Sequence, residues 1–331
     1  MEEIRDAAGH RDNGLVRGSR TLIVGLLFLA AVVVVALRLG DARDFARLLQ
    51  RAKPLWLLIS VALQVATYVC AGGIWWLVLR RTTTPQRLRT LALLAVGKVF
   101  TDQAFPSGGV AGDLFMLRAL TRRSTPRPFG VAAVVVTLLG FYAALIASTA
   151  ASLVFSWTRG HAGPVLVVMT AALLLVAFAV SSILFVLVRA RRSRAYGWLV
   201  RLAPLRTVIE SFAEAPRDAI RDPVSLAGSI GLQFVTIALD ASTLYATLAS
   251  VGEHAPAGSV FASFVFAKIA EITGMVPGGL GTFEATCVAL LHVAGVGVEP
   301  ALAATLLLRG FTFWLPMLPG LAVVRRELRR V

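Results

Sequence analysis

Eight charged residues lie inside otherwise apolar stretches of this 331-residue sequence, and their types suit the binding of a charged group. Charged side chains at membrane depth are costly unless they are paired or hydrated, so they mark candidate functional positions. The three bases could attract an anion such as phosphate, and the five acids could orient these bases or bind an amine or a sugar. Three positive and five negative formal charges sum to minus two. The residues are Lys98, Asp102, Asp113, Asp240, Lys268, Glu271, Glu284 and Arg309.

Two pairs among these eight residues have helical spacing. Lys98 and Asp102 are four residues apart, and Lys268 and Glu271 are three apart, so each pair can share one helix face. Each pair either contacts a substrate or only neutralises itself so that the segment can enter the membrane. Both interpretations stay open at this point.

The remaining charged residues have fewer local partners. Asp113 and Glu284 each stand seven residues after a proline, and Arg118 is the one base near Asp113 in the sequence. Arg309 lies in the middle of the last apolar stretch. We expect it to pair with Glu284 or with Asp240.

A proline followed by two glycines precedes each of these acids. Proline ends a helix, and glycine permits a positive φ and a close backbone approach, so such a turn can leave backbone N–H groups exposed. Exposed amides at the start of a helix attract anions such as phosphate. The alternative is a tight turn without a ligand. The residues concerned are Pro106, Gly108, Gly109 and Gly112, and Pro277, Gly278, Gly279 and Gly281.

Composition predicts that an all-α integral membrane protein positions these residues. Hydrophobic residues make up 57% of the chain and charged residues 15%, with a mean hydropathy of +0.77, whereas soluble domains have about 25% charged residues. A helix needs about 20 residues to cross a bilayer core. Six stretches qualify: residues 21–39, 54–79, 129–157, 164–188, 223–250 and 301–324. Two further apolar regions, 91–117 and 259–294, are interrupted by Pro and Gly.

Basic residues predict which segments face the cytoplasm, because short cytoplasmic loops are rich in Lys and Arg. Residues 1–20, 80–89, 118–127, 189–222 and 325–330 hold 24 of the 33 basic residues. Both flanks of 91–117 are basic, so this region is predicted to be a re-entrant hairpin, and 259–294 becomes a second hairpin from the opposite face. The five bases of 38–53 contradict this rule, and we interpret 38–53 as an amphipathic interfacial helix. In the alternative topology both interrupted regions cross, which gives eight spans.

The order Lys, acid, Pro, Gly-Gly, acid occurs twice, about 170 residues apart. The predicted topology makes the two halves inverted repeats, an arrangement in which transporters place binding sites at broken helices near the bilayer midplane. The predicted organisation is a cytoplasmic tail at 1–20, a first repeat at 21–157, a second repeat at 158–324 and a cytoplasmic tail at 325–331.

Several other chemistries lack a pattern in the sequence. The four histidines have no metal-ligand spacing, and no glycine-rich loop follows a strand to hold a nucleotide, so we expect no metal and no cofactor. Cys70 and Cys287 lie far apart in apolar stretches and are expected to be core residues. The net charge of +15 reflects cytoplasmic anchors rather than a nucleic-acid partner.

The sequence resembles the lysylphosphatidylglycerol synthase transmembrane region, a family of flippase-like integral membrane proteins. Met275-Val-Pro-Gly-Gly-Leu-Gly-Thr-Phe-Glu-Ala285 is similar to its second motif, and Phe105-Pro-Ser-Gly-Gly-Val-Ala-Gly-Asp113 with Arg118 is similar to its first. The family commonly has an Asn before the first proline, where this chain has Thr101-Asp102-Gln103. The resemblance implies that both motifs line a lipid-translocating cavity, through Pro106, Gly108, Gly109, Gly112, Asp113 and Arg118, and through Pro277, Gly278, Gly279, Gly281 and Glu284.

From these patterns we expect a multi-pass protein of the cytoplasmic membrane, with both termini cytoplasmic, that moves or binds a phospholipid or a polyprenyl-phosphate-linked lipid. Membrane lipids are its expected partners, and a homo-oligomer or a lipid-modifying enzyme partner stays open. The alternatives are a secondary transporter of a small anion and an accessory partner of a lipid-modifying glycosyltransferase. No enzymatic activity is expected, since family members that synthesise lipid carry a further soluble domain and this sequence stops at Val331.

Overall fold

The computed structural model describes residues 52–80, 82, 84–104, 109–158, 167–168, 170–172, 174–175, 218, 220, 222–273 and 279–329. All regular elements within these ranges are helices, which confirms the predicted all-α class. The predicted segments 1–20 and 21–39 lie outside the described residues, as do all but the last two residues of 38–53 and almost all of 164–188. The same holds for Pro106, Gly108, Pro277 and Gly278.

Four helices in the described part of the chain are long and apolar enough to cross a membrane, so the protein is a polytopic membrane protein. They are α3 (Pro54–Leu79), α6 (Arg127–Thr158), α11 (Pro223–Ser250) and the run Val298–Arg329. A proline in the first turn starts α3 and α11, where its missing N–H costs nothing. These helices confirm four of the six predicted spans.

The last run consists of α14 (Val298–Arg309), a π-helical turn (η3, Gly310–Trp314) and α15 (Met317–Arg329). The interruption has a local cause, because Pro316 has no N–H to donate to the carbonyl of Thr312. The side-chain amide of Gln103, from α4, donates to that carbonyl at 3.3 Å. The carbonyl left without a helical donor in one half of the chain is therefore hydrogen-bonded by a side chain from the other half.

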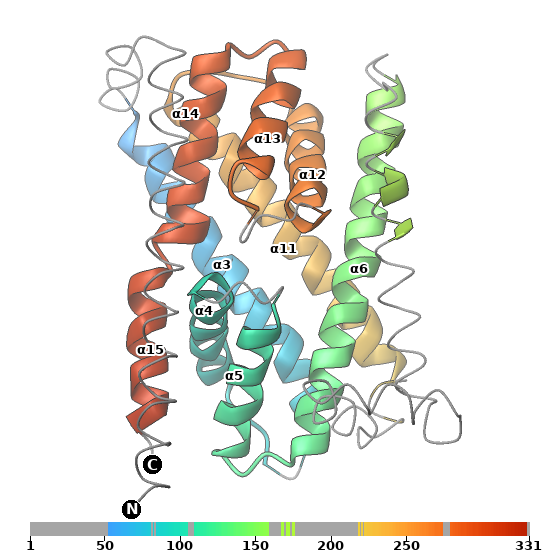
Figure 1. Ribbon diagram of the computed structural model, residues 1–331, viewed down its shortest axis with the longest axis vertical. Helices are drawn as coiled ribbons and strands as arrows, with labels where there is room; N and C mark the ends of the chain where they lie inside the picture. The colour runs from blue at the N-terminus through green and yellow to red at the C-terminus, as the bar shows by residue number, and fades with distance from the viewer. Residues whose placement is uncertain are drawn as a thin grey trace, which may run out of the picture.

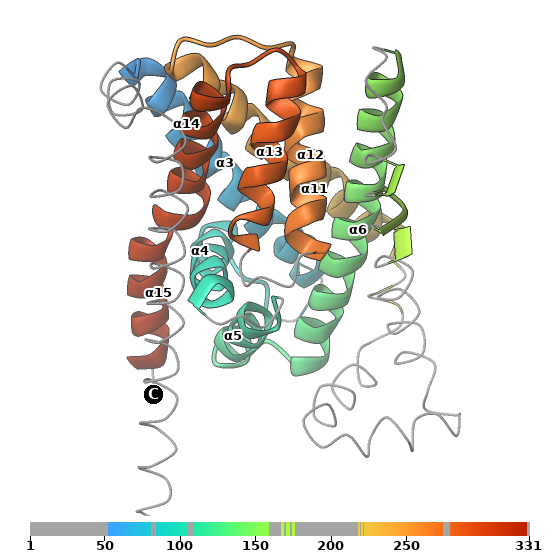
Figure 2. The same ribbon diagram turned by 45° about the horizontal axis from the view of Figure 1, so that its top comes forward.

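Two pairs of shorter helices lie at opposite ends of the molecule (Figures 1 and 2). Helices α4 (Leu88–Ala104) and α5 (Val110–Thr121) pack together at the end where α15 terminates. Helices α12 (Ala257–Thr273) and α13 (Thr282–Val293) pack together at the end where α14 begins. At 1.5 Å per residue, helices of 17 and 12 residues are about 26 and 18 Å long, short of a bilayer core of about 30 Å.

Each short pair has its own apolar core, and the long helices α3 and α11 join the two. One core surrounds α4 and α5 and includes Trp75, Leu91 and Met116. The other surrounds α12 and α13 and includes Phe266 and Cys287. Cys287 is buried as predicted, whereas Cys70 is only half-buried. The inner ends of both pairs, which carry most of the predicted site residues, point toward the middle of the molecule (Figure 1).

Candidate functional site

The first charged cluster joins α4 to α5. The Nζ of Lys98 lies 2.8 Å from Oδ2 of Asp102 and 3.0 Å from Oδ1 of Asp113. The partner of Asp113 is thus Lys98 rather than Arg118. Five residues along an α-helix turn the side chain by about 140°, so Arg118 points away from Asp113.

The start of α5 binds a carboxylate of the protein itself. Gly109 caps the helix with a φ of 92°, and the N–H of Gly112 donates to Oδ1 of Asp102 at 2.8 Å. A Cβ at position 112 would lie 2.4 Å from this oxygen, so the contact requires glycine. The sequence predicted amides free to bind an external anion, and at Gly112 this prediction is wrong because Asp102 already occupies the helix start.

The second cluster joins α12, α13 and α14 through Arg309. Its Nε lies 2.7 Å from Oε1 of Glu284, and its guanidinium lies 3.6 Å from Oε1 of Glu271. The guanidinium also stacks over the ring of Phe283 at 4.2 Å. Glu271 forms a further ion pair of 3.0 Å with Lys268, as the spacing predicts. Arg309 therefore pairs with Glu284, one of the two acids expected from the sequence, and also with Glu271.

The start of α13 also binds a carboxylate, but this one belongs to the same helix, whereas the start of α5 binds an acid of the preceding helix. Gly281 has a φ of 88°, and its N–H donates to Oε2 of Glu284 at 2.6 Å. A Cβ at Gly279 would lie 2.3 Å from Cγ of Glu271, so this turn also closes tightly on the preceding helix. In both turns, glycine lets the backbone approach an acid that belongs to the charged cluster.

The two clusters differ in charge balance and in access. One lysine serves two acids in the first cluster, whereas a lysine and an arginine serve two acids in the second. The side chains of Lys98 and Lys268 are 21% and 31% exposed, but that of Arg309 is only 6% exposed. An incoming anion can therefore reach the lysines, while Arg309 is enclosed. Among the described residues, no three His, Cys, Asp or Glu side chains are grouped to hold a metal ion.

Asp240 belongs to a separate polar contact between α11 and α3. Its Oδ1 accepts hydrogen bonds from Nε2 of Gln64 at 3.0 Å and from Oγ1 of Thr67 at 3.4 Å. Sequence reasoning missed Gln64 and Thr67, although two polar residues three apart in an apolar span are a readable signal.

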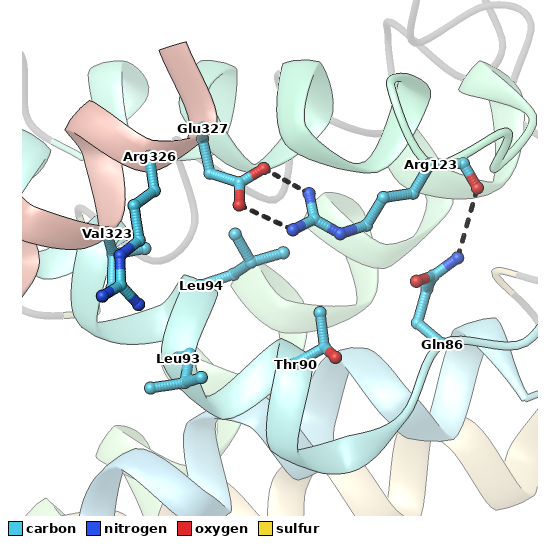
Figure 3. Close-up of a pocket in the computed structure, with 8 residues that line it drawn as sticks. All are labelled: Gln86, Thr90, Leu93, Leu94, Arg123, Val323, Arg326 and Glu327. Carbon is cyan, nitrogen blue, oxygen red and sulfur yellow. Dashed lines mark hydrogen bonds and ion pairs between the residues drawn. The ribbon is translucent and has the colours of Figure 1, made fainter. Parts of the chain in front are cut away.

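A further ion pair, also missed, lies outside both clusters, at the end of the molecule where α5 and α15 end. The guanidinium of Arg123 binds both carboxylate oxygens of Glu327, at 2.5 and 2.6 Å, and Figure 3 shows this fork beside Gln86 and Thr90. The contact attaches the end of α15 to the turn between α5 and α6. Nothing in the local sequence pairs residues that are 204 positions apart.

Comparisons with known proteins agree with this architecture. A family model described as the lysylphosphatidylglycerol synthase TM region matches residues 22–320. A protein described as a UPF0104 membrane protein, from Methanothermobacter thermautotrophicus, is 22% identical over 329 residues. That alignment covers 93% of this chain and 95% of the relative. The resemblance drawn from the two motifs is confirmed.

Proposed function

The chain belongs to the lysylphosphatidylglycerol synthase transmembrane-region family, and from this premise we propose that it translocates or binds a lipid in the cytoplasmic membrane. The lipid is a phospholipid or a polyprenyl-phosphate-linked lipid. Its headgroup lies between the inner ends of the two short helix pairs, and its acyl chains stay in the bilayer. The observation that carries this proposal is the pair of charged clusters, each at a glycine turn, that face the middle of the molecule from opposite ends.

The two short pairs act in this proposal as re-entrant hairpins of an inverted repeat. Helix lengths support the repeat, since α3, α4, α5 and α6 have 26, 17, 12 and 32 residues. Their counterparts α11, α12, α13 and the run Val298–Arg329 have 28, 17, 12 and 32 residues. The positive-φ caps Gly109 and Gly281 occupy equivalent places. An inverted repeat with broken helices suits a site that opens to either side in turn.

Ion-pair exchange gives this site a mechanism. A phosphate that binds Lys98 competes with Asp113, and the ion pair to Asp113 is a contact that joins α5 to α4. Headgroup binding therefore loosens one hairpin turn, and the equivalent exchange at Lys268 competes with Glu271 on the other side. The excess of acids would favour headgroups that carry an amine or a sugar besides the phosphate.

Transport of fluorescent lipids in liposomes containing the purified protein tests the proposal. Glu284→Gln removes the negative charge and one of the two oxygens that accept hydrogen bonds from Arg309 and Gly281. We expect this variant to slow lipid movement strongly. Glu299→Gln, at an exposed acid in the first turn of α14, is the matched control and should behave as the wild type. Unchanged movement with Glu284→Gln counts against the role. Transport of a soluble anion that does not depend on lipid identity would favour the anion transporter instead.

The proposed topology has its own test. In a variant without the native cysteines, single cysteines at positions 85 and 122 should react with a membrane-impermeant reagent from the same side, the cytoplasm. Labelling from opposite sides would reject the first hairpin and favour eight spans.

A further inference from the structure

A groove lies between α5 and α15 on the outside of the molecule, apart from both charged clusters. Helix α15 packs on α4, and α4 packs on α5, so α15 and α5 both lie against α4. The cavity between them has a volume of about 520 Å³, within the usual range for a ligand site. Its walls are mainly apolar and include Phe100, Leu114, Phe115 and Leu328.

Two arginines stand at one end of this groove. Arg118 and Arg122 are four residues apart, one helical turn, and both are exposed. The described residues that line the groove include one acid, Glu327, and both of its carboxylate oxygens bind Arg123 outside the groove. Arg122 donates to the backbone carbonyl of Glu327, which ties the end of α5 to the end of α15. The groove is thus positively charged at one end and mainly apolar along the rest of its length.

The dimensions of the groove match one leaflet of a bilayer. Its lining runs along α5 from Ala111 to Arg122, the residue that follows the helix, and the 11 steps between these residues rise about 16 Å. Half of a bilayer core is about 15 Å. With the start of α5 near the middle of the molecule, the arginines lie at the depth of the lipid headgroups, where arginine favours bidentate contacts to phosphate.

We propose that the α5–α15 groove binds one anionic phospholipid from the adjacent leaflet, with its phosphate on Arg118 and Arg122 and an acyl chain along Phe100 and Leu114. The bound lipid would fill the space between α15 and the first hairpin. This site rests on the re-entrant position proposed above for the first hairpin, and it does not require that the protein moves lipids.

A cavity at the other end of the molecule lacks charged lining residues, and this contrast favours an anionic lipid in the α5–α15 groove. This second cavity, of about 490 Å³, lies between α6, α11 and α12, where Phe155, Tyr245 and Phe261 contribute to its lining. Its described lining residues carry no charge. Of these two cavities, the α5–α15 groove is the one that combines an apolar wall with arginines, which is the arrangement that recognises acidic headgroups between helices.

Native mass spectrometry of the full chain with added phosphatidylglycerol or phosphatidylcholine tests this site. We expect the wild type to retain phosphatidylglycerol preferentially, and each arginine to contribute about fivefold to its affinity. The double variant Arg118→Gln/Arg122→Gln should therefore bind phosphatidylglycerol about 25-fold more weakly. The matched control is Arg87→Gln/Arg89→Gln, which removes two exposed charges at the same end of the molecule and outside the groove. It should change binding less than twofold.

Two further measurements separate a lipid site from a phosphate site. Leu114→Trp fills the apolar wall and should weaken phosphatidylglycerol binding while the arginines remain. Soluble glycerol phosphate in tenfold molar excess should not displace the lipid. If the double variant is less thermostable than the wild type, Arg118→Gln alone provides the charge test, since Arg118 is exposed.

The proposal is overturned if the wild type binds phosphatidylcholine equally well, or if the arginine variants bind phosphatidylglycerol as the wild type does. Displacement by glycerol phosphate, or unchanged lipid binding by Leu114→Trp, would overturn it in favour of a site for phosphate alone.

Discussion

Arg309→Met should destabilise the protein more than any other single change at the charged clusters. Arg309 is 5% exposed and Glu284 is 3% exposed, so removal of the guanidinium leaves a buried carboxylate without its cation. Glu284 would retain the N–H of Gly281, and Glu271 would retain Lys268. Breaking a buried ion pair on one side costs about 3–5 kcal/mol, and loss of the contact with the Phe283 ring adds about 1 kcal/mol.

A second substitution distinguishes an unpaired charge from lost packing. In Arg309→Met/Glu284→Met both charges are gone, and replacement of a complete buried pair by apolar residues is often neutral or better. The double variant loses the cap on Gly281, worth about 1 kcal/mol, so it should be more stable than Arg309→Met alone by about 2–4 kcal/mol. Arg326→Met, at an exposed arginine on α15, is the control and should stay within about 0.5 kcal/mol of the wild type.

Unfolding of the purified protein in mixed detergent, followed by circular dichroism, measures these differences. The expected order of stability is wild type and Arg326→Met first, then the double variant, and Arg309→Met last. If Arg309→Met unfolds at the same detergent composition as the wild type, the ion pair does not hold α13 against α14 as described. The same conclusion follows if the double variant is less stable than Arg309→Met.

Three further predictions concern individual contacts and are measured by the same unfolding assay. Gly112→Ala places a Cβ 2.4 Å from a carboxylate oxygen and should lower the free energy of unfolding by about 1–3 kcal/mol. The control Gly231→Ala has open space at its Cβ and should be neutral or stabilising by up to about 1 kcal/mol. Equal effects of the two substitutions would contradict the close approach. Asp240→Asn keeps an oxygen acceptor for Gln64 and should be tolerated. Asp240→Leu leaves that buried amide with one acceptor fewer and should lower the free energy of unfolding by about 1–3 kcal/mol. If Asp240→Asn is the less stable variant, the contact is refuted. Glu327→Gln breaks the two-bond contact with Arg123 and should lower stability by about 1–3 kcal/mol. It should also expose the end of α15 to limited proteolysis. Unchanged cleavage would mean that this contact does not hold the helix.

Much of the helical framework could be predicted from the chain alone. Proline at positions 54 and 223 marks the start of α3 and α11, and long apolar runs specify where a helix can cross a bilayer. The pair Lys98 and Asp102 was also readable, because residues four apart on a helix meet without help from the rest of the fold. Such features depend only on backbone geometry and local composition.

The contacts that complete the candidate site could not be read in this way. Asp113 reaches Lys98 only because α5 folds back on α4, and Arg309 reaches Glu271 and Glu284 only because three helices converge. The spacing of Asp113 made Arg118 the nearest base in sequence, yet the helix turns the two apart. Sequence distance is a poor guide once the partner lies on another element.

Local composition is enough to establish that this protein is helical, that it lies in a membrane and that most of its membrane-depth charges gather at two glycine turns. Those properties follow from hydropathy and from the conformations that proline and glycine allow. The folded arrangement establishes which charges neutralise one another, that the helix starts bind the protein's own carboxylates, and that Arg118 and Arg122 at the end of α5 face a groove. These outcomes depend on how helices far apart in the chain pack, since packing brings together side chains that no local rule relates.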